Sequence, residues 1–368
     1  MSALEKLPVT VVTGFLGSGK TTMIRELMQN PGGKRLAIVV NEFGDVGVDG
    51  EILKSCAIPD CPAENIMELA NGCICCTVAD DFIPTIEALM ALEPRPDHIV
   101  IETSGLALPK PLLKAFDWPD IRSKITVDGV IALADAEAVA AGRFATNVAA
   151  VDAQRLADDS IDHETPLSEV FEDQIACADI ILLTKPDLAG PDGVEKAKAM
   201  ITAKAPRKLP MVEVAEGLVD PRVILGLEAA AEDDIDARPS HHEHHHHHHH
   251  HDDHHDDDHD HHHDHDHDDF DSIVVDIPEV ADPLELVASI EALARDHNIL
   301  RVKGYAVVAE KSMRLLVQAV GARVRHQFDR PWKPDEVRQG RLVVIAEHDN
   351  IKRSVIEAAL GRVAEAAE

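Results

Sequence analysis

Short runs of β-branched and other apolar residues alternate with helix-like patterns over roughly the first 225 residues. Six apolar runs predict strands, at 9–13, 36–41, 98–102, 129–133, 180–184 and 211–214. Apolar residues spaced three and four positions apart predict helices between them, at 21–28, 82–92, 167–177 and 193–205. Because strands that alternate with helices are typical of βαβ units, we predict an α/β domain built on a mostly parallel sheet.

The hydrophobic pattern then stops and starts again. From Ser240 to Asp269 the chain is almost entirely His and Asp, with 18 of its 23 histidines and no apolar residue, so we expect a disordered linker. Beyond it, strand patterns at 273–277, 302–308, 315–320 and 342–346 accompany helix patterns at 284–294 and 351–360. We therefore predict three parts, which are the α/β domain at 1–230, the linker at 231–271 and a smaller α+β domain at 272–368.

Composition narrows the class of protein. A chain of 368 residues that is 45% apolar can bury a sizeable core. Its net charge of -32 would repel a phosphate backbone, so we expect no nucleic-acid partner. Residues 1–10 do not resemble a secretion signal and no run of 18 apolar residues is present, which predicts a soluble cytoplasmic protein with no membrane contact.

A phosphate-binding loop follows the first predicted strand. Residues 14–22 read GFLGSGKTT, a complete G-x-x-x-x-G-K-T between a strand and a helix. Glycines there let backbone N–H groups close around phosphate oxygens, while Lys20 reaches the β- and γ-phosphates and the Thr21 hydroxyl holds Mg²⁺. The residues predicted to bind nucleotide in this loop are Gly14, Gly17, Ser18, Gly19, Lys20, Thr21 and Thr22.

Two later segments extend the predicted nucleotide site. Glu102 ends the strand at 98–102, where it can hold Mg²⁺ through water or position the attacking water, and the Gly105 N–H can sense the γ-phosphate. We take Lys20 and Glu102 as the catalytic candidates.

The other segment is Thr184-Lys185-Pro186-Asp187, which closes the strand at 180–184. The Asp187 carboxylate can accept from guanine N1 and N2, a donor pair that adenine lacks, while the Lys185 stem covers the base plane. Alone, the tetrapeptide would be read as a solvated polar turn. After the phosphate loop and Glu102, it predicts GTP as the nucleotide.

Cysteine usage points to a soft metal. Cys73, Cys75 and Cys76 place three thiols in four positions, and a turning loop can direct all three at one ion. Thiolates suit zinc, cobalt or copper, and three sulfurs leave a four-coordinate ion one ligand short, which fits uptake and release. A redox or structural cysteine cluster is the alternative. Cys177, in an apolar stretch, is predicted to be a buried small hydrophobe.

An acidic loop and the His/Asp tract add candidate metal ligands. The loop at 41–50 mixes glycines with acids, and Glu42 and Asp45 are candidates for linking nucleotide state to the metal site. The His/Asp tract should bind several ions weakly, since imidazole and carboxylate both ligate metals. The alternative is a solvated spacer between the domains.

Together these segments resemble the CobW/UreG/HypB-like family of metallochaperone GTPases. The segments that carry the resemblance are GFLGSGKTT at 14–22, NEFGDVGVDGEIL at 41–53, NGCICCT at 71–77, ETSGLALPKP at 102–111, TKPD at 184–187, LRVKGY at 300–305 and FDRPW at 328–332. The resemblance implies that Mg-GTP organises a site that includes the cysteines, and that GTP hydrolysis releases the metal to a client metalloenzyme. It further implies Co²⁺ as the ion, a cobaltochelatase as the client and cobalamin biosynthesis as the pathway.

Two residues depart from the pattern of the family. Thr184 stands where most GTPases have Asn, and Asp45 replaces the longer Glu of many relatives. Thiolates bind zinc in preference to cobalt, so Zn²⁺ remains an alternative cargo.

Alternatives from other classes are a passive metal store centred on the His/Asp tract and a P-loop kinase or ATPase. No catalytic Gln or Arg finger is identifiable, which predicts slow intrinsic hydrolysis. The residues leave the oligomeric state open.

Overall fold

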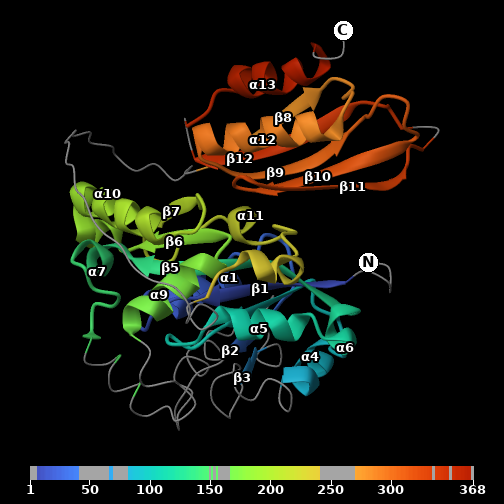
Figure 1. Cartoon of the computed structure of the whole chain (residues 1–368). Coiled ribbons are helices and arrows are strands. Elements are labelled where there is room, and N and C mark those ends of the chain that lie inside the picture. Colours follow the sequence, from blue (N-terminus) through green and yellow to red (C-terminus); the bar gives the residue numbers. More distant parts are fainter. Residues whose placement is uncertain are drawn as a thin grey trace.

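The computed structural model describes residues 6–40, 66–68, 82–148, 151, 155, 166–240, 270–333, 336–347 and 350–365. Within these ranges the chain folds into two sheets, each packed with its own helices (Figure 1). No helix in the described ranges is long and apolar enough to cross a membrane.

The first sheet has seven strands, and every neighbouring pair in it is parallel. Its order is β3-β2-β4-β1-β5-β6-β7, which confirms the predicted α/β class. The strands are β1 (Leu7–Thr13), β2 (Leu36–Val40), β3 (Ile66–Glu68), β4 (His98–Glu102), β5 (Ile125–Asp135), β6 (Ile180–Thr184) and β7 (Met211–Val214). Because β1 lies between β4 and β5, the loop after β1 opens at the centre of the sheet, where ligands bind in folds of this kind.

Helices cover both faces of this sheet. They are α1 (Lys20–Gln29), α4 (Ile83–Met90), α5 (Pro109–Phe116), α6 (Pro119–Arg122), α7 (Ala136–Ala140), α9 (Leu167–Cys177), α10 (Pro186–Lys204) and α11 (Pro221–Ile224). Side chains of β1 divide between the faces, since Val12 joins the cluster packed by α1 whereas Val9 and Val11 join the cluster packed by α4 and α5. The sequence missed α5, α6 and α7, because prolines begin the first two and the third has only five residues.

The second sheet is antiparallel, in the order β11-β10-β9-β12-β8. Its elements are β8 (Phe270–Ile277), α12 (Pro283–His297), β9 (Ile299–Ala306), β10 (Met313–Val320), β11 (Arg323–Pro331), β12 (Gly340–Glu347) and α13 (Arg353–Glu365). Both helices pack on one face, which confirms the smaller α+β domain. Strand β11 was not predicted because it is an edge strand in which charged residues interrupt the apolar pattern.

The chain remains folded beyond the point at which we expected the linker to begin. Residues 231–240 form two short 3₁₀ turns against the nucleotide domain, and the Arg238 side chain is fully buried. The Arg238 carbonyl accepts from Lys110 Nζ at 2.6 Å, and Ser240 Oγ donates to Asp173 at 2.8 Å. The His/Asp tract at 241–269 lies outside the described residues.

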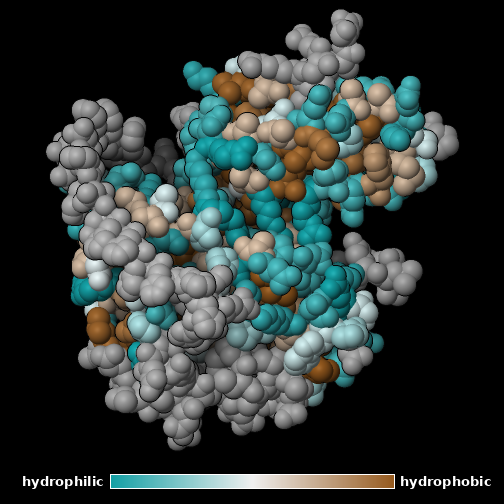
Figure 2. Space-filling model, viewed as in Figure 1, coloured by the Kyte–Doolittle hydropathy of each residue, from teal (hydrophilic) through white to brown (hydrophobic). Residues whose placement is uncertain are grey.

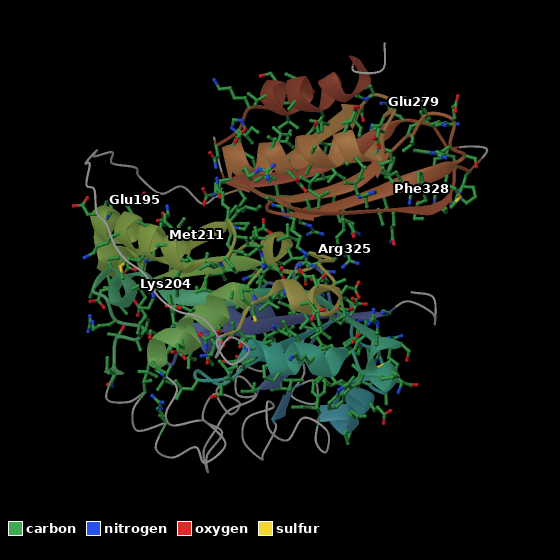
Figure 3. The ribbon with its side chains drawn as sticks, viewed as in Figure 1. Glu195, Lys204, Met211, Glu279, Arg325 and Phe328 are labelled. Atoms are coloured by element: carbon green, nitrogen blue, oxygen red, sulfur yellow. The ribbon has the colours of Figure 1, made fainter. Side chains whose placement is uncertain are left out.

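The helix-free face of the second sheet packs on the nucleotide domain. Figure 3 shows Arg325 pointing from this face towards that domain, and Figure 2 shows mostly hydrophilic residues at the junction on the visible side. Arg301 donates to the carbonyls of Arg222 (3.0 Å) and Leu225 (3.1 Å) at the end of α11. Asp128 accepts from the N–H groups of the turn that follows, residues 226–228, so this turn is held from both domains.

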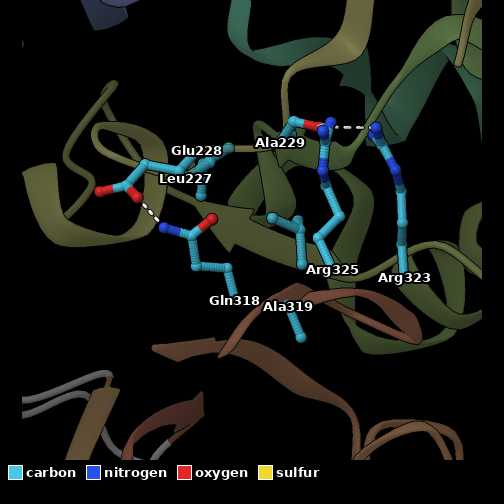
Figure 4. Close-up of a pocket in the computed structure, with 8 residues that line it drawn as sticks. Leu227, Glu228, Ala229, Gln318, Ala319, Arg323 and Arg325 are labelled. Carbon is cyan, nitrogen blue, oxygen red and sulfur yellow. Dashed lines mark hydrogen bonds between the residues drawn. The ribbon is translucent and has the colours of Figure 1, made fainter. Parts of the chain in front are cut away.

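A small cavity lies beside this turn, lined by residues of both domains (Figure 4). Glu228 accepts from Gln318 and Lys303, and the Ala229 carbonyl accepts from Arg323 at 2.6 Å and Arg325 at 3.0 Å. Charged and amide groups thus join the two domains on the side of the sheet packed by α11.

Candidate nucleotide site

The phosphate loop has the backbone that its glycines allow. It connects β1 to α1, and Gly14, Gly17 and Gly19 all have positive φ, at 139°, 75° and 96°. A Cβ on Gly14 would lie 2.5 Å from the Leu133 carbonyl oxygen of β5. Other residues are therefore excluded at position 14 by both conformation and space.

The Lys20 ammonium lies within this loop. Its side chain is buried, and Nζ donates to the carbonyls of Gly14 at 2.7 Å and Phe15 at 3.2 Å. A positive charge is thus held at the N-terminal end of α1, where anions are attracted by the helix dipole and the exposed N–H groups. The loop therefore combines a fixed cation with backbone donors, as a phosphate site requires.

Thr21 and Glu102 meet across the loop and the sheet. Thr21 Oγ1 donates to Glu102 Oε1 at 3.1 Å, and Glu102 is buried at the end of β4, in register with Val12 of β1. The sequence predicted both residues as Mg²⁺ ligands, and the structure brings them together. A hydroxyl and a carboxylate are oxygen ligands of the kind that Mg²⁺ prefers.

Four buried hydroxyls around this point have no hydrogen-bond partner in the described part of the chain. They belong to Thr13, Ser18, Thr103 and Ser104. An unsatisfied buried polar group costs about 1–3 kcal/mol, so four of them near one loop call for a ligand that satisfies them. Phosphate oxygens and a hydrated Mg²⁺ fit this set of groups.

The glycine turn after Glu102 packs directly on the phosphate loop. A Cβ on Gly105 would lie 2.6 Å from the backbone nitrogen of Leu16. From α9, the buried Gln174 side chain donates to the carbonyls of Gly105 at 3.2 Å and Ala107 at 3.3 Å. The sequence predicted Gly105 but missed Gln174, because no local motif marks a residue that acts across the fold.

Thr184 joins the predicted base-binding turn to the phosphate loop. Its Oγ1 lies 2.8 Å from the Ser18 carbonyl oxygen and 3.3 Å from that of Ala134. Lys185 follows with φ 56°, and Asp187 lies exposed in the first turn of α10. Although Thr replaces the usual Asn, this side chain still links the turn to the loop that would hold phosphate.

Asp135, at the end of β5, is a second residue that the sequence missed. Its buried carboxylate accepts from Lys185 Nζ at 2.5 Å and from Thr146 Oγ1 at 2.5 Å. Burial alone would raise the pKa of Asp135, but the hydrogen bonds from Lys185 and Thr146 hold it below its usual range. The carboxylate is therefore charged at neutral pH.

The predicted metal ligands Cys73, Cys75, Cys76, Glu42 and Asp45 lie outside the described residues. Over the described ranges, no group of three or more His, Cys, Asp or Glu side chains is arranged to hold a metal ion.

Cys177 is fully buried, and burial raises the pKa of its thiol to about 12, as expected for a small hydrophobe in the core.

Comparison with known proteins identifies both domains. The nucleotide-binding domain of the CobW/HypB/UreG family matches residues 8–213, and the cobalamin synthesis protein cobW C-terminal domain matches residues 270–364. The zinc chaperone CobW of Sinorhizobium sp is 50% identical over 344 residues, which cover 94% of each chain. The zinc chaperone CobW of Pseudomonas aeruginosa is 50% identical over 351 residues, 94% of this chain and 89% of that one.

A more distant relative matches over a similar length. The zinc chaperone YjiA of Escherichia coli is 28% identical over 352 residues, which cover 93% of this chain and 94% of that one. The fold, the phosphate loop and these matches agree, and the chain belongs to the CobW/HypB/UreG family of metallochaperone GTPases.

Proposed function

We propose that this protein is a GTP-dependent chaperone that carries one divalent ion on Cys73, Cys75 and Cys76 and delivers it to a client metalloenzyme. The observation that carries the proposal is the candidate nucleotide site. Lys20, the Thr21–Glu102 pair and four hydroxyls that have no partner among the described residues lie in and beside the phosphate loop. The CobW relatives, named zinc chaperones, support Zn²⁺ as the ion.

Hydrolysis would use the residues around the phosphate loop. Water adds to the γ-phosphorus as the bond from that phosphorus to the β–γ bridging oxygen breaks, giving GDP and phosphate. Lys20 and the backbone N–H groups of the loop bind the phosphates, and Glu102 orients the attacking water. Mg²⁺, when held by Thr21 and Glu102, would neutralise charge on the β- and γ-oxygens.

The sheet register supports a link between nucleotide and metal. Val40 ends β2 and pairs with Glu68 of β3 on one side and with Glu102 of β4 on the other. The chain leaves β2 towards Glu42 and Asp45, and leaves β3 towards the cysteines, at the same level of the sheet as Glu102. A change at Glu102 on loss of the γ-phosphate would therefore be felt at the ends of β2 and β3, the strands that precede these two segments in the sequence.

Metal titration tests the cysteine assignment. Cys75→Ser and Cys76→Ser proteins should lose tight Zn²⁺ binding measured with a non-hydrolysable GTP analogue, because each removes one thiolate. Cys177→Ala is the matched control, since that thiol is fully buried in the core, and it should bind Zn²⁺ normally. Unchanged tight binding in both serine variants would refute the assignment.

The second candidate function is delivery of Co²⁺ to a cobaltochelatase in cobalamin biosynthesis. The match of residues 270–364 to the cobalamin synthesis protein cobW C-terminal domain favours it. Competition between Zn²⁺ and Co²⁺ for the protein bound to Mg-GTP separates the two cargoes. Because thiolates prefer zinc, a chaperone for cobalt must show selectivity against that trend.

Nucleotide preference tests the base-binding turn. The wild-type protein should bind GTP more tightly than ATP, and Asp187→Ala should remove that preference because guanine N1 and N2 lose their acceptor. Asp192→Ala, which removes another exposed carboxylate from α10, is the control and should leave the preference intact. An Asp187→Ala protein that still prefers GTP would exclude this turn as the guanine site.

Deletion of residues 241–267 distinguishes a chaperone from a passive metal store. A chaperone keeps one nucleotide-dependent metal site after the deletion, whereas a store loses its capacity. Retention of a single site whose affinity responds to GTP is the expected result.

A further inference from the structure

Lys185 stands where the local backbone favours other residues. Its φ of 56° and ψ of 43° are left-handed, it precedes Pro186, and it caps the N-terminus of α10 with no side-chain capping bond. The left-handed region favours Gly or Asn, and the residue before a proline is directed towards extended conformations. Helix N-termini also favour acids and small polar residues over a cation.

The fold alone therefore gives no reason for a lysine at this position. Backbone strain of this sort persists where the surrounding structure holds it and is concentrated at functional sites. We therefore look to the side chain of Lys185 for the reason that a lysine is present, and this side chain points to the Asp135 carboxylate. Its ammonium lies 2.5 Å from the Asp135 carboxylate, which is 1% exposed, whereas the lysine itself is 31% exposed.

Asp135 is itself fixed from several sides. It pairs with Thr184 in the β5–β6 register, and its Oδ1 accepts from the Ala138 N–H at 3.1 Å as the N-cap of α7. Its Oδ2 accepts from Thr146 and from Lys185. A charged, buried carboxylate on a strand end is thus a rigid anchor for a flexible lysine.

The stem of Lys185 and the Asp187 carboxylate are two residues apart on a strained turn. When the ammonium is held at one end, the four methylene groups of the stem are restricted to few of the many conformations that a solvated lysine samples. A side chain that is already ordered loses less entropy when a ligand packs against it. Such ordering improves affinity for whatever lies against the stem.

We propose that Asp135 is a positioning residue for guanine recognition, which holds the Lys185 ammonium so that the lysine stem is ready to cover the base while Asp187 accepts from the base edge. Asp135 does not touch the nucleotide. This inference rests on the proposed function of the turn at 184–187 as the guanine site.

Asp135→Asn in the full chain is the direct test. Asparagine keeps the side-chain length and the oxygen that caps α7, but removes the charge that holds Lys185. The dissociation constant for a fluorescent GDP analogue should rise about tenfold, while turnover at saturating GTP changes less than about twofold. The inosine analogue should weaken by the same factor, because the lysine stem covers the base plane and not the 2-amino group.

A double-mutant cycle shows whether Asp135 acts through Lys185. Lys185→Met should weaken GDP binding by a similar factor, and Asp135→Asn added to it should have little further effect. Asp220→Asn is the matched control, since Asp220 also caps a short helix, α11, and pairs with a cation, Arg222. It should leave GDP affinity unchanged even if the melting temperature falls.

Three results would overturn the inference: GDP affinity unchanged in Asp135→Asn, additive losses in the double variant, or an equal loss in the Asp220→Asn control. The Asp187→Ala variant distinguishes failure of the positioning role of Asp135 from failure of the guanine site itself. If Asp187→Ala abolishes the preference for guanine while Asp135→Asn has no effect, the site stands and only the positioning role falls.

Discussion

Replacement of Asp179 by alanine should destabilise both domains at once. Asp179 lies directly before β6, its side chain is 1% exposed, and it accepts from Arg238 at 2.8 Å and Arg323 at 2.9 Å. Burial alone would raise its pKa, but the arginines hold that pKa below the usual range, so the carboxylate is charged. Arg238 belongs to the segment before the His/Asp tract, and Arg323 belongs to the C-terminal domain.

The magnitude follows from what the substitution leaves behind. Arg238 is fully buried, and without Asp179 its remaining carboxylate partner among the described residues is Asp234, at 3.0 Å. Breaking a buried ion pair by removing one partner costs about 3–5 kcal/mol. For a chain of this size that corresponds to a fall in melting temperature of roughly 4–7 °C.

Tryptophan fluorescence can follow each domain. The chain has two tryptophans, Trp118 at the start of α6 and Trp332 after β11, where it contacts Tyr305. Urea unfolding of Trp118→Phe and Trp332→Phe proteins, each with and without Asp179→Ala, reports one domain at a time. Both transitions should move to lower urea, because Asp179 connects the domains.

An exposed ion pair of the same chemistry is the control. Asp276 pairs with Arg341 at 2.7 Å on the surface of the C-terminal sheet, where each side chain is about half exposed. Asp276→Ala should leave the urea midpoints of both domains almost unchanged, because exposed ion pairs contribute little to stability. If Asp179→Ala costs as little as the control, or shifts one tryptophan transition only, the reasoning about a shared buried charge is wrong.

Three further changes have expected outcomes. Burial lowers the pKa of His98 to about 4, below its value of about 6.5 in the unfolded chain. The free energy of unfolding should therefore fall by about 3 kcal/mol as the pH drops from 6.5 to 4, because the unfolded chain binds a proton that the buried imidazole does not. The His98→Gln protein should show a smaller fall in urea unfolding over that pH range. Gly105→Ala should weaken GTP binding at least about tenfold in titration calorimetry, since its Cβ would meet the Leu16 nitrogen, and normal binding would mean that the turn moves without cost. Gln174→Leu should reduce the preference for GTP over GDP, because the Gly105 carbonyl loses its donor; a preserved ratio would leave Gln174 with a packing role only.

The parts of the nucleotide site that could be predicted are those encoded locally. The phosphate loop is contiguous, so Lys20 and Thr21 could be named as candidates from the motif without a fold. Glu102 was recognisable as the polar end of an apolar strand. In the structure these residues meet because β1 and β4 are neighbours, as expected for a parallel sheet.

The residues that could not be predicted act through partners distant in sequence. Gln174 reaches Gly105 across 69 positions, and Asp135 reaches Lys185 across 50. Neither residue has a neighbour in the sequence that marks its role, and each would be read as an ordinary helix or strand-end residue. Only the three-dimensional path of the chain brings them to Gly105 and Lys185 at the candidate nucleotide site.

The central position of β1 sets the order in which this protein can be built during synthesis. The first strand of the chain pairs with β4, which begins at His98, and with β5, which begins at Ile125. Since these pairings are far apart in sequence, they form late and slowly compared with local contacts. The phosphate loop leaves the ribosome before β5, so the wall formed by Leu133 is added later. A nascent chain that stalls before this point lacks one wall of the phosphate loop. We therefore expect nucleotide to stabilise only chains that have passed it.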